Sequence, residues 1–132
     1  MKKPLAAAIA VLLASTAQAQ VTIKLGTLAP AGSTWHEILK ELGQRWEQAS
    51  GGAVKLRVYA GGTQGSEGDM VRKMGINQLQ ASSISNIGMH DIMPEPQMLS
   101  LPMFFDGEAD VECAFQKMRA RLEAAFEAKG FV

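Results

Sequence analysis

The sequence contains very little cysteine, few aromatic residues and no excess of charge of either sign. Its 132 residues include one Cys, 6% aromatic residues, and 13 basic against 13 acidic side chains. A single Cys excludes an internal disulfide framework and a Cys-rich zinc site. The balanced charge gives no basic surface of the kind that binds nucleic acid. No apolar run reaches the roughly 18 residues that a membrane-spanning helix needs.

The common sequence patterns of metal binding and catalysis are also missing. His36 and Glu37 begin an H-E pair, but position 40 is Lys, so the H-E-x-x-H zinc pattern is not completed. There is no G-x-S-x-G segment, and we expect Cys113 to be buried within an apolar helical pattern. The glycine-rich stretch Gly61–Gly65 lacks the G-K-[ST] ending of a phosphate-binding loop. We therefore expect no enzyme activity, no metal site and no cofactor.

The first 19 residues have the pattern of a secretory signal peptide. Lys2 and Lys3 precede the apolar run Leu5–Ala14, and Ala17-Gln18-Ala19 supplies small residues before a cleavage site. The alternative is a membrane anchor, for which the apolar run is too short. We expect cleavage after position 19, export to the periplasm, and a mature domain of residues 20–132.

Strand and helix patterns alternate along this mature domain. Apolar and polar residues alternate over three short segments, which predicts strands at 21–26, 54–59 and 79–84. Apolar residues at spacings of three and four predict helices, begun by Ser33 or Thr34, by Ser66 and by Asp106. Strands that alternate with helices favour an α/β fold with a mainly parallel sheet and helices on both faces.

The second half of the domain is less regular in pattern. Asn86–Pro102 contains three prolines and is expected to be irregular, with room for one helical turn. Leu101–Phe105 is apolar enough to be buried against the sheet. Phe131 and Val132 have the character of a further strand. Most of the methionines occupy apolar positions of these elements, so we expect them to fill the core.

Three predicted loops follow the carboxyl ends of strands and are rich in small or hydrogen-bonding residues. In open α/β sheets, ligands bind outside these ends, where helix N-termini also favour anions. The loops span residues 27–35, 60–66 and 82–86. A site for a small carboxylate explains this composition, but Ser, Thr and Gly also dominate loops that bind nothing. The pattern alone leaves the two alternatives equal.

Several segments, in their order and spacing, resemble the solute receptors of TRAP transporters, the DctP-type periplasmic solute-binding proteins. No single segment is specific, and the resemblance covers nearly all of the mature domain. Its main pieces are Ile23–Gly26, Gly32–His36, Ser50–Val58, Gly61–Ser66, Met70–Gly75, Pro94-Glu95, Leu99–Phe105 and Lys129–Phe131.

The resemblance implies the first lobe of a type II periplasmic-binding-protein fold, which captures a small organic acid. The acid would pass to the membrane permease subunits of the transporter, which an ion gradient drives. In this family the first lobe lines the cleft with the loop after the first strand and with the end of the third strand. The candidate ligand-binding residues are therefore Leu28, Ala29, Trp35, His36, Ser82, Ser83 and Ser85, with Gln64 added from the glycine-rich loop.

The sequence departs from the family in two respects. Leu28 and Ser83 stand where many members have a charged or amide side chain. The second lobe, whose arginine holds the substrate carboxylate, has no counterpart, so we expect a truncated first lobe with weak binding and an exposed sheet edge. The alternative is a self-standing secreted α/β protein that pairs with another chain at that edge. A small secreted hydrolase is disfavoured because no catalytic set is present.

Overall fold

The computed structural model describes residues 20–132, which contain a parallel three-stranded sheet. β1 (Val21–Thr27) lies in the middle, with β2 (Val54–Tyr59) and β3 (Ala81–Ser83) hydrogen-bonded on either side. Both pairings are parallel. The predicted α/β class and parallel sheet are confirmed, although the third strand is shorter than expected. The predicted signal peptide, residues 1–19, lies outside the described residues.

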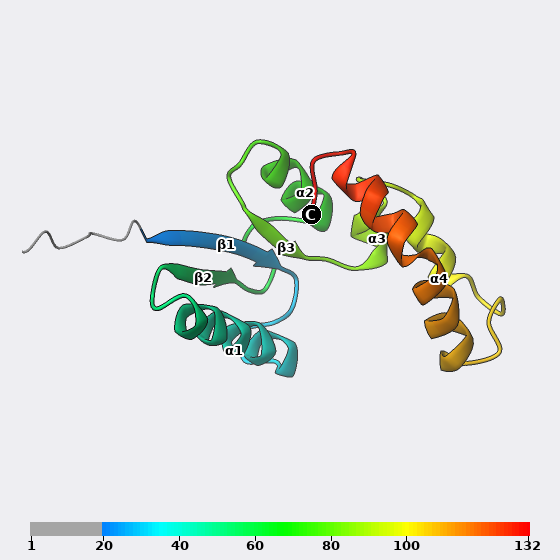
Figure 1. Ribbon diagram of the computed structural model, residues 1–132, viewed down its shortest axis with the longest axis horizontal. Helices are drawn as coiled ribbons and strands as arrows, with labels where there is room; N and C mark the ends of the chain where they lie inside the picture. Colours follow the sequence, from blue (N-terminus) through cyan, green and yellow to red (C-terminus); the bar gives the residue numbers. More distant parts are fainter. Residues whose placement is uncertain (1–19) are drawn as a thin grey trace, which may run out of the picture.

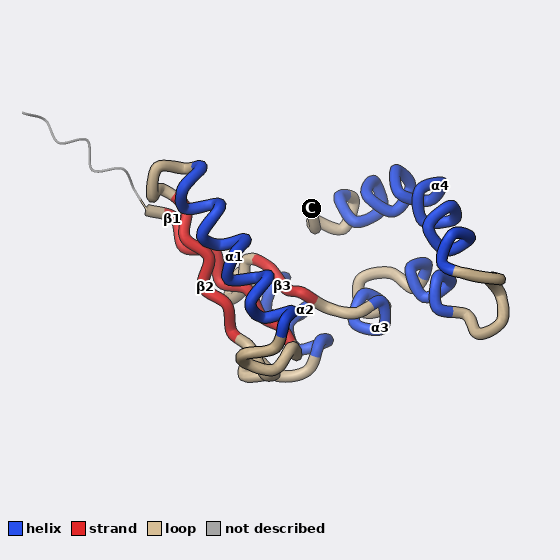
Figure 2. The backbone as a smooth tube through the Cα atoms, turned by 90° about the horizontal axis from the view of Figure 1, so that it is seen from below, coloured by secondary structure: helices blue, strands red, loops and turns tan. Residues whose placement is uncertain are grey.

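Helix α1 (Thr34–Ala49) and helix α2 (Glu67–Gly75) lie on opposite sides of the sheet (Figures 1 and 2). Ser33 caps α1, because its hydroxyl accepts the backbone N–H of His36 at 3.3 Å. Leu39 is the residue of α1 that is buried. A side chain at Gly43 would begin 3.0 Å from Leu56 Cβ, so the glycine permits close packing of α1 on β2.

A reciprocal capping box begins α2, as the sequence predicts. The Ser66 hydroxyl accepts the backbone N–H of Asp69, and the Asp69 carboxylate accepts the backbone N–H of Ser66. One turn into the helix, Met70 is completely buried. A Cβ at Gly26 would lie 3.0 Å from the Met70 sulfur, so the glycine favours the close approach of β1 and α2. The expected core role of a methionine is confirmed at this position.

A second group of helices follows the sheet. Helix α3 (Asn86–Met89) and the 3₁₀ helix η1 (Glu95–Ser100) occupy the segment expected to be irregular, and helix α4 (Glu108–Glu127) packs against η1. Figure 2 shows this group set beside the sheet and its two covering helices. The prediction that Asp106 caps α4 is wrong. Gly107 occupies the N-cap position without a side-chain bond, and the Asp106 backbone N–H donates to Asp110.

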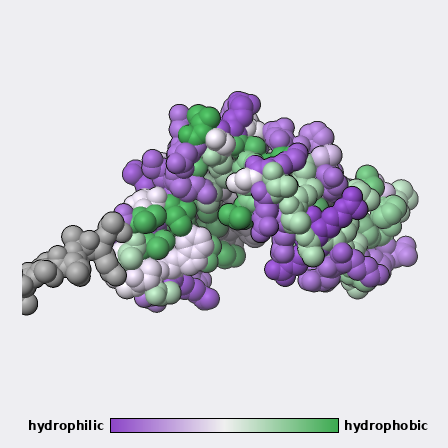
Figure 3. Space-filling model, turned by 45° about the horizontal axis from the view of Figure 1, so that its top comes forward, coloured by the Kyte–Doolittle hydropathy of each residue, from purple (hydrophilic) through white to green (hydrophobic). Residues whose placement is uncertain are grey.

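Three further expectations for this second group are also wrong. Leu101–Phe105 does not pack against the sheet: Met103 is fully exposed and Phe104 is 63% exposed. Cys113 is exposed as well. The physical reason is that α4 packs against η1 rather than against the small sheet, so Leu122 is its one buried residue. Phe131 and Val132 form no strand. Apolar side chains are accordingly visible among hydrophilic ones on the surface in Figure 3.

Candidate functional site

The strand order places one natural binding position in the described sheet. From β1 the chain passes through α1 to β2 on one side, and from β2 it passes through α2 to β3 on the other side. The order therefore reverses between β1 and β3. In open α/β sheets the crevice forms at the carboxyl ends of the strands at such a point. The segments that border it here are the loop after Thr27 and the loop after Ser83, and we call this edge the β1–β3 rim.

One hydrogen bond spans the β1–β3 rim. The indole Nε1–H of Trp35, in the first turn of α1, donates to Oγ of Ser83, the last residue of β3, at 2.9 Å. The Trp35 residue is nevertheless 56% exposed. The bond therefore holds an aromatic ring across the carboxyl end of the sheet without burying it. Ser83 uses its oxygen as the acceptor, so its own O–H remains able to donate.

The other two serines of the predicted set direct their hydroxyls to internal partners. Ser82 Oγ donates to the backbone oxygen of Gly26 at 3.0 Å. Ser85 Oγ donates to the Glu67 carboxylate at 2.7 Å and accepts the backbone N–H groups at the start of α3. These two hydroxyls stabilise the sheet and the β3–α3 turn, and a ligand would have to displace those bonds to use them.

His36 lies at the start of α1 in a fixed orientation. Its Nδ1 accepts the backbone N–H of Gly32 at 3.0 Å, and its side chain is 17% exposed. An accepting Nδ1 requires that the proton of the neutral ring be on Nε2. The Nε2–H group is thus the donor that His36 can offer a ligand. Glu37 Oε1 lies 3.7 Å from Nδ1, at the outer limit of an ion pair that needs a protonated ring.

Leu28 and Ala29 belong to a loop that is bonded to its neighbour. The backbone oxygen of Ala29 accepts the N–H of Gly61 at 2.8 Å, and the backbone oxygen of Thr27 accepts the N–H of Gly62 at 3.0 Å. The Leu28 side chain is 46% exposed and reaches over Gly62, which has a positive φ of 70°. The loops after β1 and β2 therefore form one continuous backbone platform.

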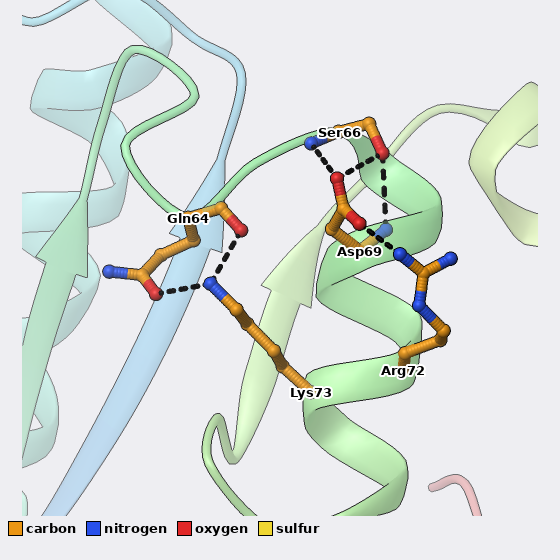
Figure 4. A network of polar contacts seen from close by, with 5 residues as sticks. All are labelled: Gln64, Ser66, Asp69, Arg72 and Lys73. Carbon is orange, nitrogen blue, oxygen red and sulfur yellow. Dashed lines mark hydrogen bonds and ion pairs between the residues drawn. The ribbon is translucent and has the colours of Figure 1, made fainter.

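Gln64 is the predicted residue that the structure turns away from the others. Its side-chain and backbone oxygens both accept from Nζ of Lys73, at 3.2 and 2.8 Å, beside α2 (Figure 4). Lys73 was not among the residues singled out from the sequence. It lies on a helical face, where lysine is common, and nothing in the spacing indicates that it would reach back nine residues.

Next to Gln64, the capping box changes the acidity of one carboxyl group. Hydrogen bonds from the Ser66 side chain and backbone lower the pKa of Asp69 below its usual value, and the positive charge of Arg72 adds to the effect (Figure 4). Asp69 also pairs with Arg72 on the exposed surface. These residues stabilise the start of α2 and do not reach the β1–β3 rim.

A separate groove of about 910 Å³ runs along the outer edge of β3, between the end of α2 and the end of α4. Its apolar lining includes Leu79, Ile84, Phe126 and Phe131. Within residues 20–132, no three His, Cys, Asp or Glu side chains gather closely enough to hold a metal ion. No helix in that same range has the length and apolar character to cross a membrane.

Comparison with known proteins identifies relatives of this fold. Residues 25–132 match the family described as bacterial extracellular solute-binding protein, family 7 (DctP). A TRAP periplasmic solute-binding protein from Pseudomonas putida F1, solved with bound D-glucuronate, is 26% identical, with a TM-score of 0.56 over 60% of this chain and 26% of that chain. No curated protein matches the chain significantly.

Two further structures share the fold at lower identity. A receptor of the same kind from a Bradyrhizobium species, in complex with D-galacturonate, is 24% identical, with a TM-score of 0.71 over 83% of this chain and 37% of that chain. Another from Sulfurospirillum deleyianum, with bound succinate, is 17% identical, with a TM-score of 0.72 over 85% and 36%. The chain thus spans well under half of each protein, and the predicted first-lobe fold is confirmed.

Proposed function

Because the chain belongs to the bacterial extracellular solute-binding proteins of family 7, we propose that it captures a small organic acid for a TRAP transporter. The acid binds at the β1–β3 rim. Export through the cleaved signal peptide places the protein in the periplasm, where it delivers the acid to the membrane permease subunits for uptake driven by an ion gradient. The protein acts as a receptor and not as an enzyme.

The observation that carries this proposal is the hydrogen bond from Trp35 to Ser83 across the point where the strand order reverses. It brings together two residues that are 48 positions apart, at the position where sheets of this type bind ligands. The Ser83 O–H and the His36 Nε2–H are donors that suit the oxygens of an acid. The structures of similar fold hold D-glucuronate, D-galacturonate and succinate, which supports an acid as the ligand.

None of the candidate residues carries a fixed positive charge. Lys73, the cation that contacts Gln64, donates to two oxygens of that residue. A carboxylate bound by neutral donors alone is bound weakly, because such hydrogen bonds largely replace bonds to water. We therefore expect dissociation constants on the order of 1 mM or weaker for residues 20–132.

Chemical-shift mapping tests the proposal at this affinity. Residues 20–132, labelled with ¹⁵N, are titrated with D-glucuronate, D-galacturonate, succinate and, as a neutral control, D-glucose at matched ionic strength. The proposal predicts that acids shift the amides of residues 28–36 and 82–85 and that glucose does not. Shifts confined to other surfaces, or none at concentrations of about 20 mM, would contradict it.

A second function, pairing with another chain, is favoured by the groove along β3. The outer side of this edge strand faces the groove, and an unpaired strand edge is a template for another strand. Sedimentation of residues 20–132 over a range of concentrations tests it. A discrete dimer of fixed stoichiometry would support this function, and a monomer at all concentrations would exclude self-pairing.

A further inference from the structure

We propose that Trp35 makes the receptor selective for organic acids that carry a ring, by stacking that ring on its indole. This inference rests on the proposed function and specifies its substrate class. The shared chemistry is a carboxylate attached to a flat or chair-shaped ring, either a pyranose or an aromatic ring. An open-chain acid of the same size makes the polar contacts but not the stacking contact.

The indole of Trp35 connects α1 to β3. Trp35 lies in the first turn of α1, and its Nε1–H donates to Ser83 Oγ at the end of β3. The indole therefore bridges the start of α1, which follows the loop after β1, and the end of β3, the two segments that border the β1–β3 rim. The Trp35 residue is 56% exposed, so this hydrogen bond does not remove it from solvent.

The indole ring is apolar apart from its N–H group. A tryptophan has one polar atom, and here Ser83 satisfies it. The exposed remainder is an apolar aromatic surface, which attracts the C–H faces of sugars and the faces of other aromatic rings. The hydrogen bond also restricts rotation of the side chain, so less conformational entropy is lost when a ligand stacks on it.

The candidate residues that surround Trp35 are uncharged or apolar. The other candidate residues at the rim offer no charged side chain: Leu28 is half exposed and apolar, Ala29 is apolar, and His36 offers a neutral ring N–H. Two acidic side chains lie beside these residues and both are paired: Glu67 accepts hydrogen bonds from Ser85, and Glu37 forms an ion pair with Lys40. This lobe is thus suited to the uncharged body of an acid, and a ring presents the largest such body to a flat indole.

The test compares cyclic and open-chain acids by NMR. The sequence contains two tryptophans, so the spectrum of residues 20–132 has two indole N–H signals, which a Trp46→Phe variant assigns. D-glucuronate and benzoate represent the two ring classes, and D-gluconate and succinate are their open-chain counterparts. The inference predicts that at least one cyclic acid shifts the Trp35 signal and binds about fivefold more tightly than its open-chain counterpart. The Trp46 signal serves as the internal reference and should not move.

Variants separate stacking from general binding. Trp35→Leu should abolish the preference for the cyclic acid, Trp35→Phe should keep part of it, and Ser83→Ala should weaken it by freeing the indole. Ile38→Ala, at an exposed position one turn along α1, should change nothing. Equal affinity for cyclic and open-chain acids, or an unchanged preference in Trp35→Leu, would overturn the selectivity while leaving the rim as the binding site. If no acid shifts any rim amide, the proposed function fails as well.

Discussion

Glu67, the first residue of α2, accepts two hydrogen bonds from Ser85, the residue before α3. The Ser85 backbone N–H lies 2.8 Å from Oε1, and its hydroxyl lies 2.7 Å from Oε2. This pair joins the starts of α2 and α3 through residues that are 18 positions apart. Since Ser83 is two residues before Ser85, the same pair ties the chain just after the partner of Trp35 to the start of α2.

Replacing this carboxylate with an amide should destabilise the protein. Glu67→Gln keeps the size of the side chain but leaves a weaker acceptor for the N–H and hydroxyl of Ser85. We expect a loss of about 1 kcal/mol in the free energy of unfolding, since hydrogen bonds to charged groups exceed neutral ones. Urea denaturation measures it. Glu41→Gln, which removes the same charge from an exposed ion pair with Arg45, is the control and should cost less than about 0.5 kcal/mol.

Gly88 should not tolerate even a methyl group. It is buried in α3, and an added Cβ would lie 2.6 Å from both Cβ and Oε2 of Glu67. Gly88→Ala should therefore cost about 1–3 kcal/mol, because the α2–α3 contact must open. Gly75→Ala is the matched control: it also lies in a helix, no atom is within 4 Å, and it should be neutral or slightly stabilising. Equal melting temperatures for the two variants would contradict this packing.

Stability should fall at acidic pH through Asp69. Hydrogen bonds from Ser66 depress the pKa of this carboxyl below its ordinary value of 3.8 in the folded protein. A depressed folded pKa means that the stabilisation is present above the unfolded pKa and is lost as pH falls through the folded value. As the pH is lowered from about 5 to about 2, a range that spans the ordinary pKa of a carboxyl group, the wild type should lose more stability than Asp69→Asn. Parallel pH profiles for the two proteins in thermal denaturation would contradict it.

The open edge of β3 should promote association. The Ser82 hydroxyl points toward the sulfur of Met70 in α2. Because side chains alternate along a strand, Ala81 points to the opposite face of the sheet, and it also lines the groove. Ala81→Lys places a charge at this edge and should suppress concentration-dependent association, because charged edge strands pair poorly. Light scattering coupled to gel filtration measures the mass. Association that persists unchanged in Ala81→Lys would move the contact to another surface, such as the exposed segment around Met103 and Phe104.

The first half of the fold was predictable because its signals are local. Apolar periodicity marks α1 and α2, and Ser33 and Ser66 precede their helices as the capping rules require. The second half of the fold depends on which helices pack against one another, here α3 and α4 against η1. In α4, Phe115 belongs to a set of apolar residues spaced three and four apart, yet this residue is 38% exposed, because η1 covers only part of the helix. Periodicity indicates that a face is apolar, but not whether another element covers it.

The candidate site was predictable as a place but not as a set of orientations. The position of Leu28 and Ser83 at the ends of β1 and β3 follows from strand order. The direction of each side chain does not. Gln64 is paired with Lys73, and Ser85 with Glu67, through contacts between residues nine and 18 positions apart. Nothing in their spacing distinguishes such partners from solvent-exposed side chains.

The backbone bonds from Gly61 to Ala29 and from Gly62 to Thr27 have a mechanical consequence. They stiffen two adjoining turns, so neither can retreat to admit a bulkier solute without dragging the other along. Adjustment to solutes of different shape on this side of the rim would then depend on rotation of individual side chains, such as the half-exposed Leu28.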